Sequence, residues 1–269
     1  MLVIGERINA SNSSVADAIA RRDSEYVANL VRAQAVAGAD YIDLNAGAGK
    51  STGYSEIETI EWLVEVAQTA TDKPLAIDSE SPGVIEAALR KYHGATPIIN
   101  SVTAEKSRLE SVGALATKYQ ADLVALAMGK EGIPDTAEKR LATCDIIMAH
   151  LLQLGISAKQ VYFDPLVLPI SVDSSQGMVT LRTLEQIKCR YPEAKTVMGL
   201  SNISYGLPVR KYINRHFLLM AACAGLDAAI LDPLDTKMMS LTRVADLLLG
   251  ADPMSRDYLR AYRKGLIID

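Results

Sequence analysis

Acidic and amide side chains follow nearly every apolar run of this chain that is short enough to form a β-strand. Along the sequence they are Glu6, Asn9, Asp43, Asn45, Asp78, Asn100, Asp164, Ser201, Asn202 and Asp232, with Lys130 just beyond the fifth run. Taken singly, an Asp, Asn or Ser after a strand is as readily the cap of the next helix. Asp78 and Asp164, however, each close an apolar run, where a buried carboxylate needs hydrogen-bond donors from a ligand or from neighbouring residues. Such a set suits a planar, uncharged heterocycle rich in N–H groups and does not suit a phosphate.

Metal and nucleophile chemistry fit these residues less well. No His or Cys stands at the end of an apolar run, and the three histidines fall in helical stretches or at helix ends. Tetrahedral zinc prefers those two ligands, so a zinc site is disfavoured. A Ser–His–Asp or Cys–His system would lack its base. A magnesium site on the carboxylates stays open, because oxygen ligands suit that ion.

The segment from Leu44 to Ser51 ends in Gly-Lys-Ser, as a phosphate-binding loop does. Leu44 stands where that motif has its first glycine, and Gly53 and Ser55 continue the loop where the motif requires a helix. We therefore expect a flexible glycine-rich loop over the mouth of the fold here, and not a nucleotide site.

The apolar runs themselves predict a scaffold that brings many strand ends together. Most are apolar throughout, as strands covered on both faces of a parallel sheet are. The expected strands are Leu2–Ile8, Tyr41–Asn45, Pro74–Asp78, Pro97–Asn100, Asp122–Met128, Val161–Leu166, Thr196–Leu200 and Ala228–Asp232. Eight strands, each followed by a helix, over about 250 residues predict an α/β fold, a parallel (β/α)8 TIM barrel with its site at the carboxyl ends of the strands. A doubly wound open sheet needs fewer units and leaves residues unused.

Helix-length stretches with three-and-four apolar spacing lie between these strands. Two clear stripes are Ile57, Ile60, Val64 and Ala67, and Leu109, Val112, Ala116 and Tyr119. Gly38, Gly155 and Gly225 follow such stretches, where a left-handed residue can end a helix. No linker or composition shift divides the chain, so residues 1–269 are predicted as one domain, with 253–269 a short C-terminal extension.

The composition limits which kinds of partner and which cellular compartment are expected for the protein. Apolar residues make up 49% and charged residues 22%, which excludes global disorder, and the net charge of −4 gives no broad attraction to nucleic acid. The longest late apolar run, Phe217–Leu226, stops at Asp227 and is too short for a membrane span. Charges at Glu6 and Arg7 leave no signal core. Three scattered cysteines indicate a reduced, cytoplasmic setting.

Several short segments, in order along the chain, carry a resemblance to a known family. They are Ile4-Gly5-Glu6-Arg7-Ile8-Asn9, Asp43-Leu44-Asn45, Ile77-Asp78-Ser79, Ile99-Asn100-Ser101, Asp164-Pro165-Leu166, Gly199-Leu200-Ser201-Asn202, Ile213-Asn214-Arg215 and Gly225-Leu226-Asp227-Ala228-Ala229-Ile230. The chain resembles the pterin-binding methyltransferases that move a methyl group between tetrahydrofolate and a corrinoid protein. These belong to the superfamily that includes dihydropteroate synthase.

The resemblance implies roles for individual residues. Asp78, Asn100 and Asp164 would hold the pterin through its ring N–H, amino and ring-nitrogen groups, and Asn202 would lie beside N5, which carries the methyl group. The remaining pocket residues would be Asp43, Gly199, Ser201, Arg210 and Glu6. A tertiary amine is a poor leaving group, so Asn202 would act by donating to N5 as charge develops in the transition state. The proton would come from solvent or through a water near Asp43.

The resemblance also implies a substrate, a partner and an assembly. Tetrahydrofolate or its 5-methyl form would be the substrate, and cobalamin would be carried by a corrinoid protein docking at the barrel mouth. The enzyme would bind no metal of its own and would form a homodimer, which helices rich in Ala, Leu and Met also favour. The physiological direction of transfer stays open.

Two departures and two alternatives accompany this interpretation. Tyr205 stands where a small or amide side chain is expected, and the loop over residues 46–54 is unlike that of the relatives. A dihydropteroate synthase-type enzyme is disfavoured, because Gly49-Lys50-Ser51-Thr52-Gly53 replaces its Ser-Thr-Arg-Pro loop. A non-catalytic folate-binding or corrinoid-docking barrel is the other alternative.

Overall fold

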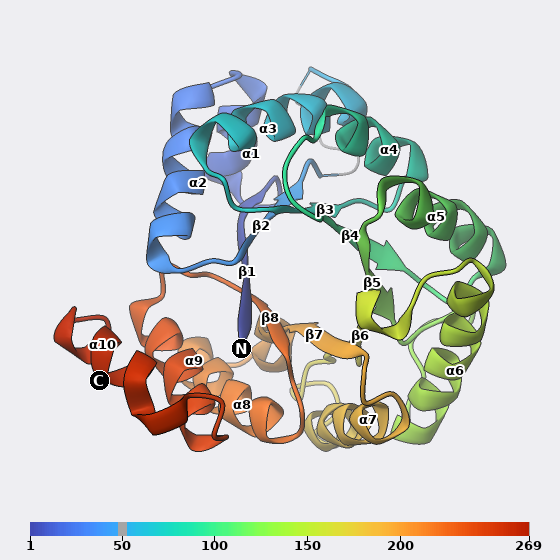
Figure 1. Cartoon of the computed structure of the whole chain (residues 1–269), viewed down its shortest axis with the longest axis vertical. Coiled ribbons are helices and arrows are strands. Elements are labelled where there is room, and N and C mark those ends of the chain that lie inside the picture. The colour runs from blue at the N-terminus through green and yellow to red at the C-terminus, as the bar shows by residue number, and fades with distance from the viewer. Residues whose placement is uncertain (48–52, 269) are drawn as a thin grey trace.

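Eight parallel strands close into a barrel in the computed structural model, which describes residues 1–47 and 53–268 (Figure 1). The strands are β1 (Leu2–Asn9), β2 (Tyr41–Asn45), β3 (Leu75–Asp78), β4 (Ile98–Val102), β5 (Asp122–Leu126), β6 (Val161–Asp164), β7 (Lys195–Gly199) and β8 (Ala228–Leu231). Each strand pairs with the next, and β8 pairs with β1 to complete the ring. The predicted (β/α)8 barrel is confirmed, and the ends of the predicted strands differ from the observed ones by at most two residues.

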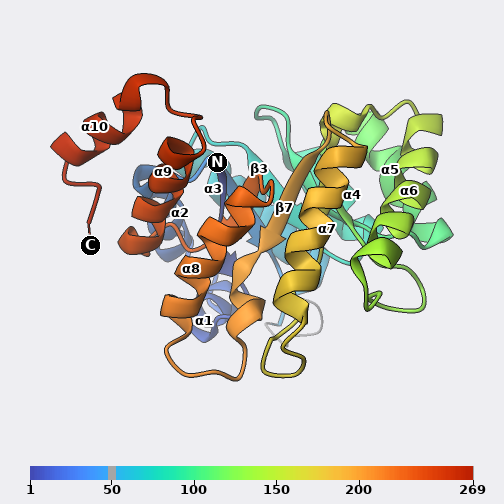
Figure 2. The same cartoon turned by 90° about the horizontal axis from the view of Figure 1, so that it is seen from below.

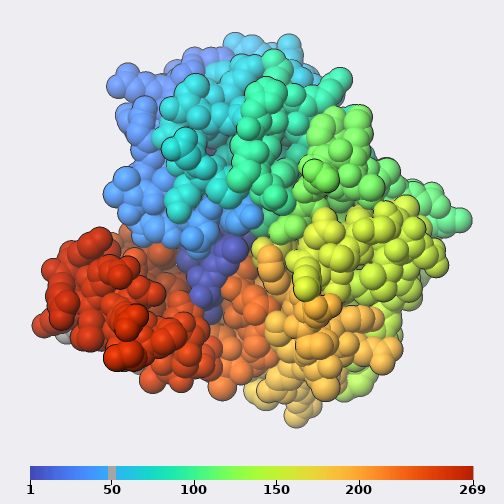
Figure 3. Space-filling view, viewed as in Figure 1, coloured from blue at the N-terminus to red at the C-terminus, as the bar shows by residue number. Residues whose placement is uncertain are grey.

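Helices surround the barrel and follow the strands along the chain (Figure 1). They are α1 (Ser13–Ala20), α2 (Ser24–Ala37), α3 (Glu56–Ala70), α4 (Pro82–Lys91), α5 (Lys106–Tyr119), α6 (Ala137–Gln153), α7 (Gln176–Arg190), α8 (Arg210–Cys223), α9 (Thr236–Leu248) and α10 (Arg256–Arg263), with short 3-10 turns η1 (Ala158–Gln160), η2 (Leu200–Ser204) and η3 (Pro253–Ser255). Figure 2 shows α10 beside α9, at the end of the molecule that also holds the N-terminus. Figure 3 shows this end in space-filling form, with the N-terminal segment at the surface between the first and last units.

Helix ends and helix faces largely agree with the sequence pattern. Gly38 and Gly225 have φ angles of +108° and +104°, and the left-handed glycines predicted after the helices are confirmed there. In α3, Ile60, Val64 and Ala67 are fully buried against the barrel. Ile57 is 43% exposed, so its predicted place in the buried stripe is wrong, because it lies in the first turn at the outer end of that stripe.

Two apolar layers stabilise the barrel. The larger one lies between the strands and the helices and contains outward-facing residues such as Leu44, Ile77 and Phe163, all fully buried. The smaller one fills the barrel interior and consists of Ile4, Ala76, Ile98, Val124, Tyr162, Val197 and Ala228. This interior plug supports the residues that come next along each strand.

In the described part of the chain, no helix is long and apolar enough to cross a membrane. The single-domain organisation over residues 1–269, with 253–269 as an extension, stays a prediction.

Candidate active site at the carboxyl ends of the strands

Polar residues lie directly above the apolar plug of the barrel. Because side chains alternate along a strand, residues two apart share a face, and the residue two positions after each interior one also faces inward. On six strands this gives Glu6 after Ile4, Asp43 after Tyr41 (which packs against the plug), Asp78 after Ala76, Asn100 after Ile98, Asp164 after Tyr162 and Gly199 after Val197, while the apolar Leu126 and Ile230 take the same place on β5 and β8. We call the first six residues the mouth layer. Six of the predicted site residues are therefore brought to one level of the barrel.

Strand pairing places part of the mouth layer in one row. Asn45 pairs with Asp78, and Asp78 pairs with Asn100, across β2, β3 and β4. The Asn45 Nδ2 donates to Asp78 Oδ2 at 2.6 Å, and the Gly47 N–H donates to Asn45 Oδ1 at 2.8 Å. Asn45, which the sequence marked as a strand end without a role, orients the carboxyl group of Asp78.

Two bulges adjust which side chains face the mouth. In β1, three residue steps from Gly5 to Ile8 oppose two steps of β2, so β1 contains one extra residue and also pairs Asn9 with Asn45. In β4, Asn100 and Val102 oppose neighbouring residues of β5. Bulges commonly occur beside active sites, where they redirect a side chain. Both bulges here lie at the level of the mouth layer.

Asp43 is the most buried carboxyl group of the mouth layer, with 3% of the residue exposed. Burial raises its pKa well above the ordinary range, and the nearby charges of Asp78 and Glu6 act in the same direction, while Asn100 opposes them. Its Oδ1 atom has no hydrogen-bond partner among the described residues. The group is therefore poised to hold a proton or to accept a donor from a ligand.

Asp78 and Asp164 have raised pKa values for the same main reason. Burial raises the pKa of Asp78, and the hydrogen bond from Asn45 opposes it. Burial raises the pKa of Asp164 to about 7, against the opposing effects of the Leu166 N–H, which donates to Asp164 Oδ1 at 2.8 Å, and of Arg140. Several carboxyl groups with raised pKa values at one level of the barrel are typical of a functional site.

Two arginines that the sequence analysis missed fix the loops around these carboxyl groups. Arg140 of α6 is fully buried, and its guanidinium donates to the carbonyl oxygens of Pro165 and Leu166 at 3.0 and 2.8 Å and to the Gln176 side chain at 2.8 Å. Arg108 of α5 donates to carbonyl oxygens in the loops after β3 and β4, those of Ser79, Glu80 and Ser101. A signal for Arg140 exists in the sequence, because it is a charged residue in the buried stripe of α6.

Asn202 lies in the turn η2, directly after β7, and its side chain is exposed. Arg210 holds this turn, because its Nη2 donates to the Ser201 carbonyl at 2.7 Å and its Nε to Ser204 Oγ at 3.1 Å. The Arg210 guanidinium is therefore hydrogen-bonded to the turn that contains Asn202. Tyr205 is 64% exposed at the end of the turn, and its N–H donates to the Asn202 carbonyl at 3.0 Å.

Gly199 leaves open space at the end of β7. Its φ angle of −83° is accessible to any residue, and an added Cβ would meet no atom within 4 Å. Neither backbone conformation nor packing against the protein requires a glycine there. The position offers room for a flat ligand to lie against the backbone.

A cavity of about 130 Å³ opens beside the mouth layer between β1, β8 and α8. Its lining includes Glu6, Ser201, Asn214 and Asp232. Burial raises the pKa of Glu6 to about 7, the charge of Asp232 adds to this, and Arg7 opposes it. Asp232 itself lies one residue beyond β8 and accepts from Arg7 Nη1 at 3.4 Å.

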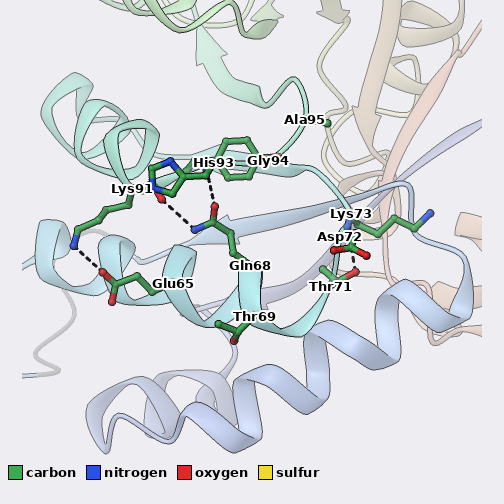
Figure 4. A pocket seen from close by; sticks show the side chains of 11 residues that line it. Glu65, Gln68, Thr69, Thr71, Asp72, Lys73, Lys91, His93, Gly94 and Ala95 are labelled. Atoms are coloured by element: carbon green, nitrogen blue, oxygen red, sulfur yellow. Dashed lines mark hydrogen bonds and ion pairs between the residues drawn. The ribbon is translucent and has the colours of Figure 1, made fainter.

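A larger hollow of about 850 Å³ lies at the opposite end of the barrel, where β3 and β4 begin (Figure 4). Several of its polar groups pair with one another: Lys91 pairs with Glu65 at 2.7 Å, and Gln68 forms hydrogen bonds with the backbone of Lys91 and His93. This hollow brings together none of the predicted site residues, and barrel active sites lie at the other end.

Residues 48–52, which include all of Gly49-Lys50-Ser51, lie outside the described residues, so the loop predicted there stays a prediction. Over residues 1–47 and 53–268, no group of three or more His, Cys, Asp and Glu side chains is arranged to hold a metal ion. That the protein uses no metal of its own stays a prediction.

Comparison with known proteins points to one family. A family model described as "Pterin binding enzyme" matches residues 5–232. The methylcorrinoid:tetrahydrofolate methyltransferase of Eubacterium limosum is 32% identical over 271 residues, covering 99% of this chain and 98% of that protein. The methionine synthase of Mycobacterium tuberculosis (strain ATCC 25618 / H37Rv) is 29% identical over 259 residues, or 91% of this chain but 21% of that protein.

Solved structures with the same architecture include dihydropteroate synthases. That of Vibrio fischeri ES114 superposes with a TM-score of 0.70 at 16% identity, covering 94% of both chains. That of Xanthomonas albilineans in complex with 7,8-dihydropteroate has a TM-score of 0.64 at 17% identity, covering 94% of this chain and 93% of the other. At these identities the likeness shows a shared fold.

Proposed function

This chain belongs to the pterin binding enzymes, and on that premise we propose that it moves a methyl group between N5 of tetrahydrofolate and the cobalt of a corrinoid protein. One observation carries the proposal: the buried carboxyl groups of Asp43 and Asp164 and the half-buried one of Asp78 share one inward layer with Asn100. The end-to-end similarity to a methylcorrinoid:tetrahydrofolate methyltransferase supports it.

The mouth layer suits the hydrogen-bonding edge of a pterin. Asp78, Asn100 and Asp164 come from β3, β4 and β6 and present acceptors and an amide to ring N–H, amino and ring-nitrogen groups. Asp43 and Glu6 offer further carboxyl groups from β2 and β1. Gly199, Ser201 and Arg210 complete the pocket, Gly199 by leaving room and Arg210 by holding the turn η2.

Asn202 is the residue proposed to act on the reacting nitrogen. Its exposed carboxamide forms no hydrogen bond with any of the described residues, so its N–H groups are available to a ligand. When the methyl group leaves, the electron pair of the C–N bond stays on N5, and one proton must reach that nitrogen. An amide that donates to N5 as this charge develops stabilises the transition state more than the bound substrate.

The proposed setting follows from the same chemistry. Cobalamin is carried by a corrinoid protein that docks at the barrel mouth, because the cobalt must approach N5 closely. The enzyme works in the cytoplasm as a homodimer, without nucleic acid or membrane partners. It supplies binding, orientation and hydrogen bonds, and the corrinoid supplies the methyl acceptor or donor.

A second candidate function has one observation in its favour. The shared fold with dihydropteroate synthases is compatible with an enzyme that joins p-aminobenzoate to a dihydropterin pyrophosphate. The sequence similarity to the methyltransferase is much higher than that to the synthases, which favours methyl transfer.

Absorption spectroscopy of the corrinoid tests the proposal. The protein is mixed anaerobically with 5-methyltetrahydrofolate and cob(I)alamin, and the cob(I)alamin band should disappear as the methylcobalamin band grows, in proportion to enzyme. Pteroate formed from p-aminobenzoate and dihydropterin pyrophosphate, without any cobalt change, would identify a synthase. Tight folate binding with neither reaction would identify a binding protein and reject the methyltransferase assignment.

A further inference from the structure

Glu6 and Asp232 approach each other across the seam where the barrel closes. Gly5 of β1 pairs with Leu231 of β8, and each acidic residue directly follows its member of this pair. Both line the cavity of about 130 Å³, which has room for several water molecules. The seam therefore brings together two half-buried carboxyl groups, that of Glu6 in the mouth layer and that of Asp232 one residue beyond β8.

Unpartnered buried atoms on both sides of Glu6 require donors. Asn214 lines the cavity, and its buried Oδ1 has no hydrogen-bond partner among residues 1–47 and 53–268. Asp43 Oδ1 is in the same situation on the neighbouring strand. An acceptor buried in this way costs about 1–3 kcal/mol unless a water, a protonated carboxyl group or a ligand donates to it. Both sides of Glu6 therefore contain acceptors that a water or a protonated carboxyl group could satisfy.

Resting on the proposed methyl transfer, we propose that Glu6 is the acid that delivers the proton to N5 of the folate and that Asp232 and the cavity reload it from solvent. The residues proposed to hold the ring lie on β3, β4 and β6, and β1 lies on the other side of the closed barrel. If Asp78, Asn100 and Asp164 hold one edge of the pterin ring, its opposite edge faces β7, β8 and β1. Ser201, the neighbour of Asn202, lines the same cavity as Glu6.

The charged groups around Glu6 keep it protonated close to neutral pH. Burial and the charge of Asp232 raise its pKa to about 7, Arg7 opposes them, and Asp43 faces it from β2. The cavity also contains Lys211 and Asp235, but these two pair with each other at 3.8 Å. Asp235 is held further by Arg215 at 2.7 Å, whereas Asp232 has only the longer contact of 3.4 Å with Arg7, and its charge is the one that raises the Glu6 pKa.

The proton balance is simple in both directions. In the forward step the C–N bond breaks, its electron pair remains on N5, and the methyl group passes to cobalt. The Glu6 O–H bond breaks as N5 gains the proton. The Glu6 carboxylate is then reprotonated from solvent through the cavity water, which passes one proton on and receives another. In the reverse step the carboxylate accepts the proton that N5 loses as it is methylated.

Single-turnover rapid mixing with 5-methyltetrahydrofolate and cob(I)alamin across pH tests the inference. In the wild type the rate should rise as pH falls through about 7, where Glu6 becomes protonated. We call this rise in rate with falling pH the pH limb. Glu6→Gln should lose about 100-fold in rate and should lose the pH limb, which is typical for removal of a general acid. Folate affinity, measured by calorimetry on the same sample, should change by no more than about threefold, since the loss of one neutral contact is small.

Three further variants separate proton delivery from a structural role. Glu6→Ala should regain rate with added formate, whereas Glu6→Gln should not, because its amide fills the cavity. Asp232→Asn should move the pH limb to lower pH, because the charge that raises the Glu6 pKa is gone. Asp235→Asn, in the same cavity but paired with Arg215, should leave the limb in place.

The outcomes distinguish this inference from the proposed function. A wild type that transfers methyl groups, with Glu6→Gln keeping its rate and pH limb, overturns the role of Glu6 alone. An unmoved limb in Asp232→Asn overturns the coupling of Asp232 to Glu6, on which its part in the reloading rests. A wild type that transfers no methyl group overturns the proposed function and this inference together.

Discussion

At the residue scale, the buried carboxyl group of Asp164 lowers the free energy of unfolding at the pH values where the carboxyl group must ionise. Its pKa of about 7 compares with an ordinary 3.8, so between these pH values the folded state holds a proton that the unfolded state has released. The free energy of unfolding therefore falls as pH rises through this window, and the loss is complete above it. At pH 8 the cost is on the order of 4 kcal/mol.

Asp164→Asn should stabilise the ligand-free protein while damaging the site. The amide carries no charge to bury, so the free energy of unfolding in urea should rise at pH 8 and change little at pH 4. Pterin affinity should fall by about 2–3 kcal/mol, because an N–H of the amide meets ligand N–H groups. The exposed Asp17→Asn is the control and should change stability by less than about 0.5 kcal/mol. A variant that is less stable at pH 8, or that binds folate normally, would remove Asp164 from its assigned place.

At the scale of elements, Arg140 connects α6 to the loop that follows β6. Its buried guanidinium donates hydrogen bonds to the carbonyl oxygens of Pro134, Pro165 and Leu166 and to the Gln176 side chain. Leu166, held in this way with a φ of +65°, in turn donates to Asp164. The helix therefore positions the carboxyl group through the loop.

Arg140→Lys should destabilise the protein by about 2–4 kcal/mol, because a lysine has three donors on one atom and leaves buried acceptors unpaired. Folate affinity should fall as well, since the loop no longer fixes Asp164. Urea unfolding and calorimetry measure the two effects. Arg190→Lys, whose side chain is 60% exposed beside Asp145, is the matched control and should be close to neutral. Equal stability of the two lysine variants would contradict the role given to Arg140.

The sequence predicts the elements better than it predicts their details. All eight strands could be predicted because each is an apolar run that repeats after a helix-length stretch, and the inward polar residues follow from those strand ends. The bulges at Gly5 and Asn100 depend on which residues pair across strands, which periodicity does not contain. The hydrogen bonds of Asn45 and Arg140 depend on contacts between distant segments in the same way.

At the scale of the whole molecule, the barrel separates stability from function along its axis. The apolar plug fills the end where the strands begin, and the mouth layer lies above it at the other end. Substitutions in the plug, such as Ile98→Ala, act on stability, whereas those in the mouth layer act on binding and catalysis. The roles of individual mouth residues stay predictions.

The assembly is open to a direct measurement. A twofold dimer of barrels should sediment at twice the 29.0 kDa chain mass at micromolar concentration. The expectation rests on apolar side chains on outer helices, among them Ile146, which is 58% exposed, and Met220, which is 51% exposed. A sedimenting species of 29.0 kDa would contradict it.

Metal dependence is a second property of the whole molecule. Because the proposed chemistry needs hydrogen bonds and a proton from the enzyme, full activity should survive exhaustive chelation with EDTA. Activity lost on chelation and restored by a divalent ion would show that the carboxyl groups of the mouth layer hold a metal.

The most direct test of the whole account is a single-turnover comparison of the wild type with Asn202→Ala, in which the cobalt absorption bands and the folate affinity are measured on the same samples. The wild type should convert cob(I)alamin to methylcobalamin. The variant should do so about 10² to 10³ times more slowly, because a preorganised donor to N5 is lost. Its folate affinity should fall by about tenfold or less, since Asp78, Asn100 and Asp164 still hold the ring. A variant with the wild-type transfer rate and only weaker folate binding would show that Asn202 is a passive contact, and the account of catalysis would be wrong.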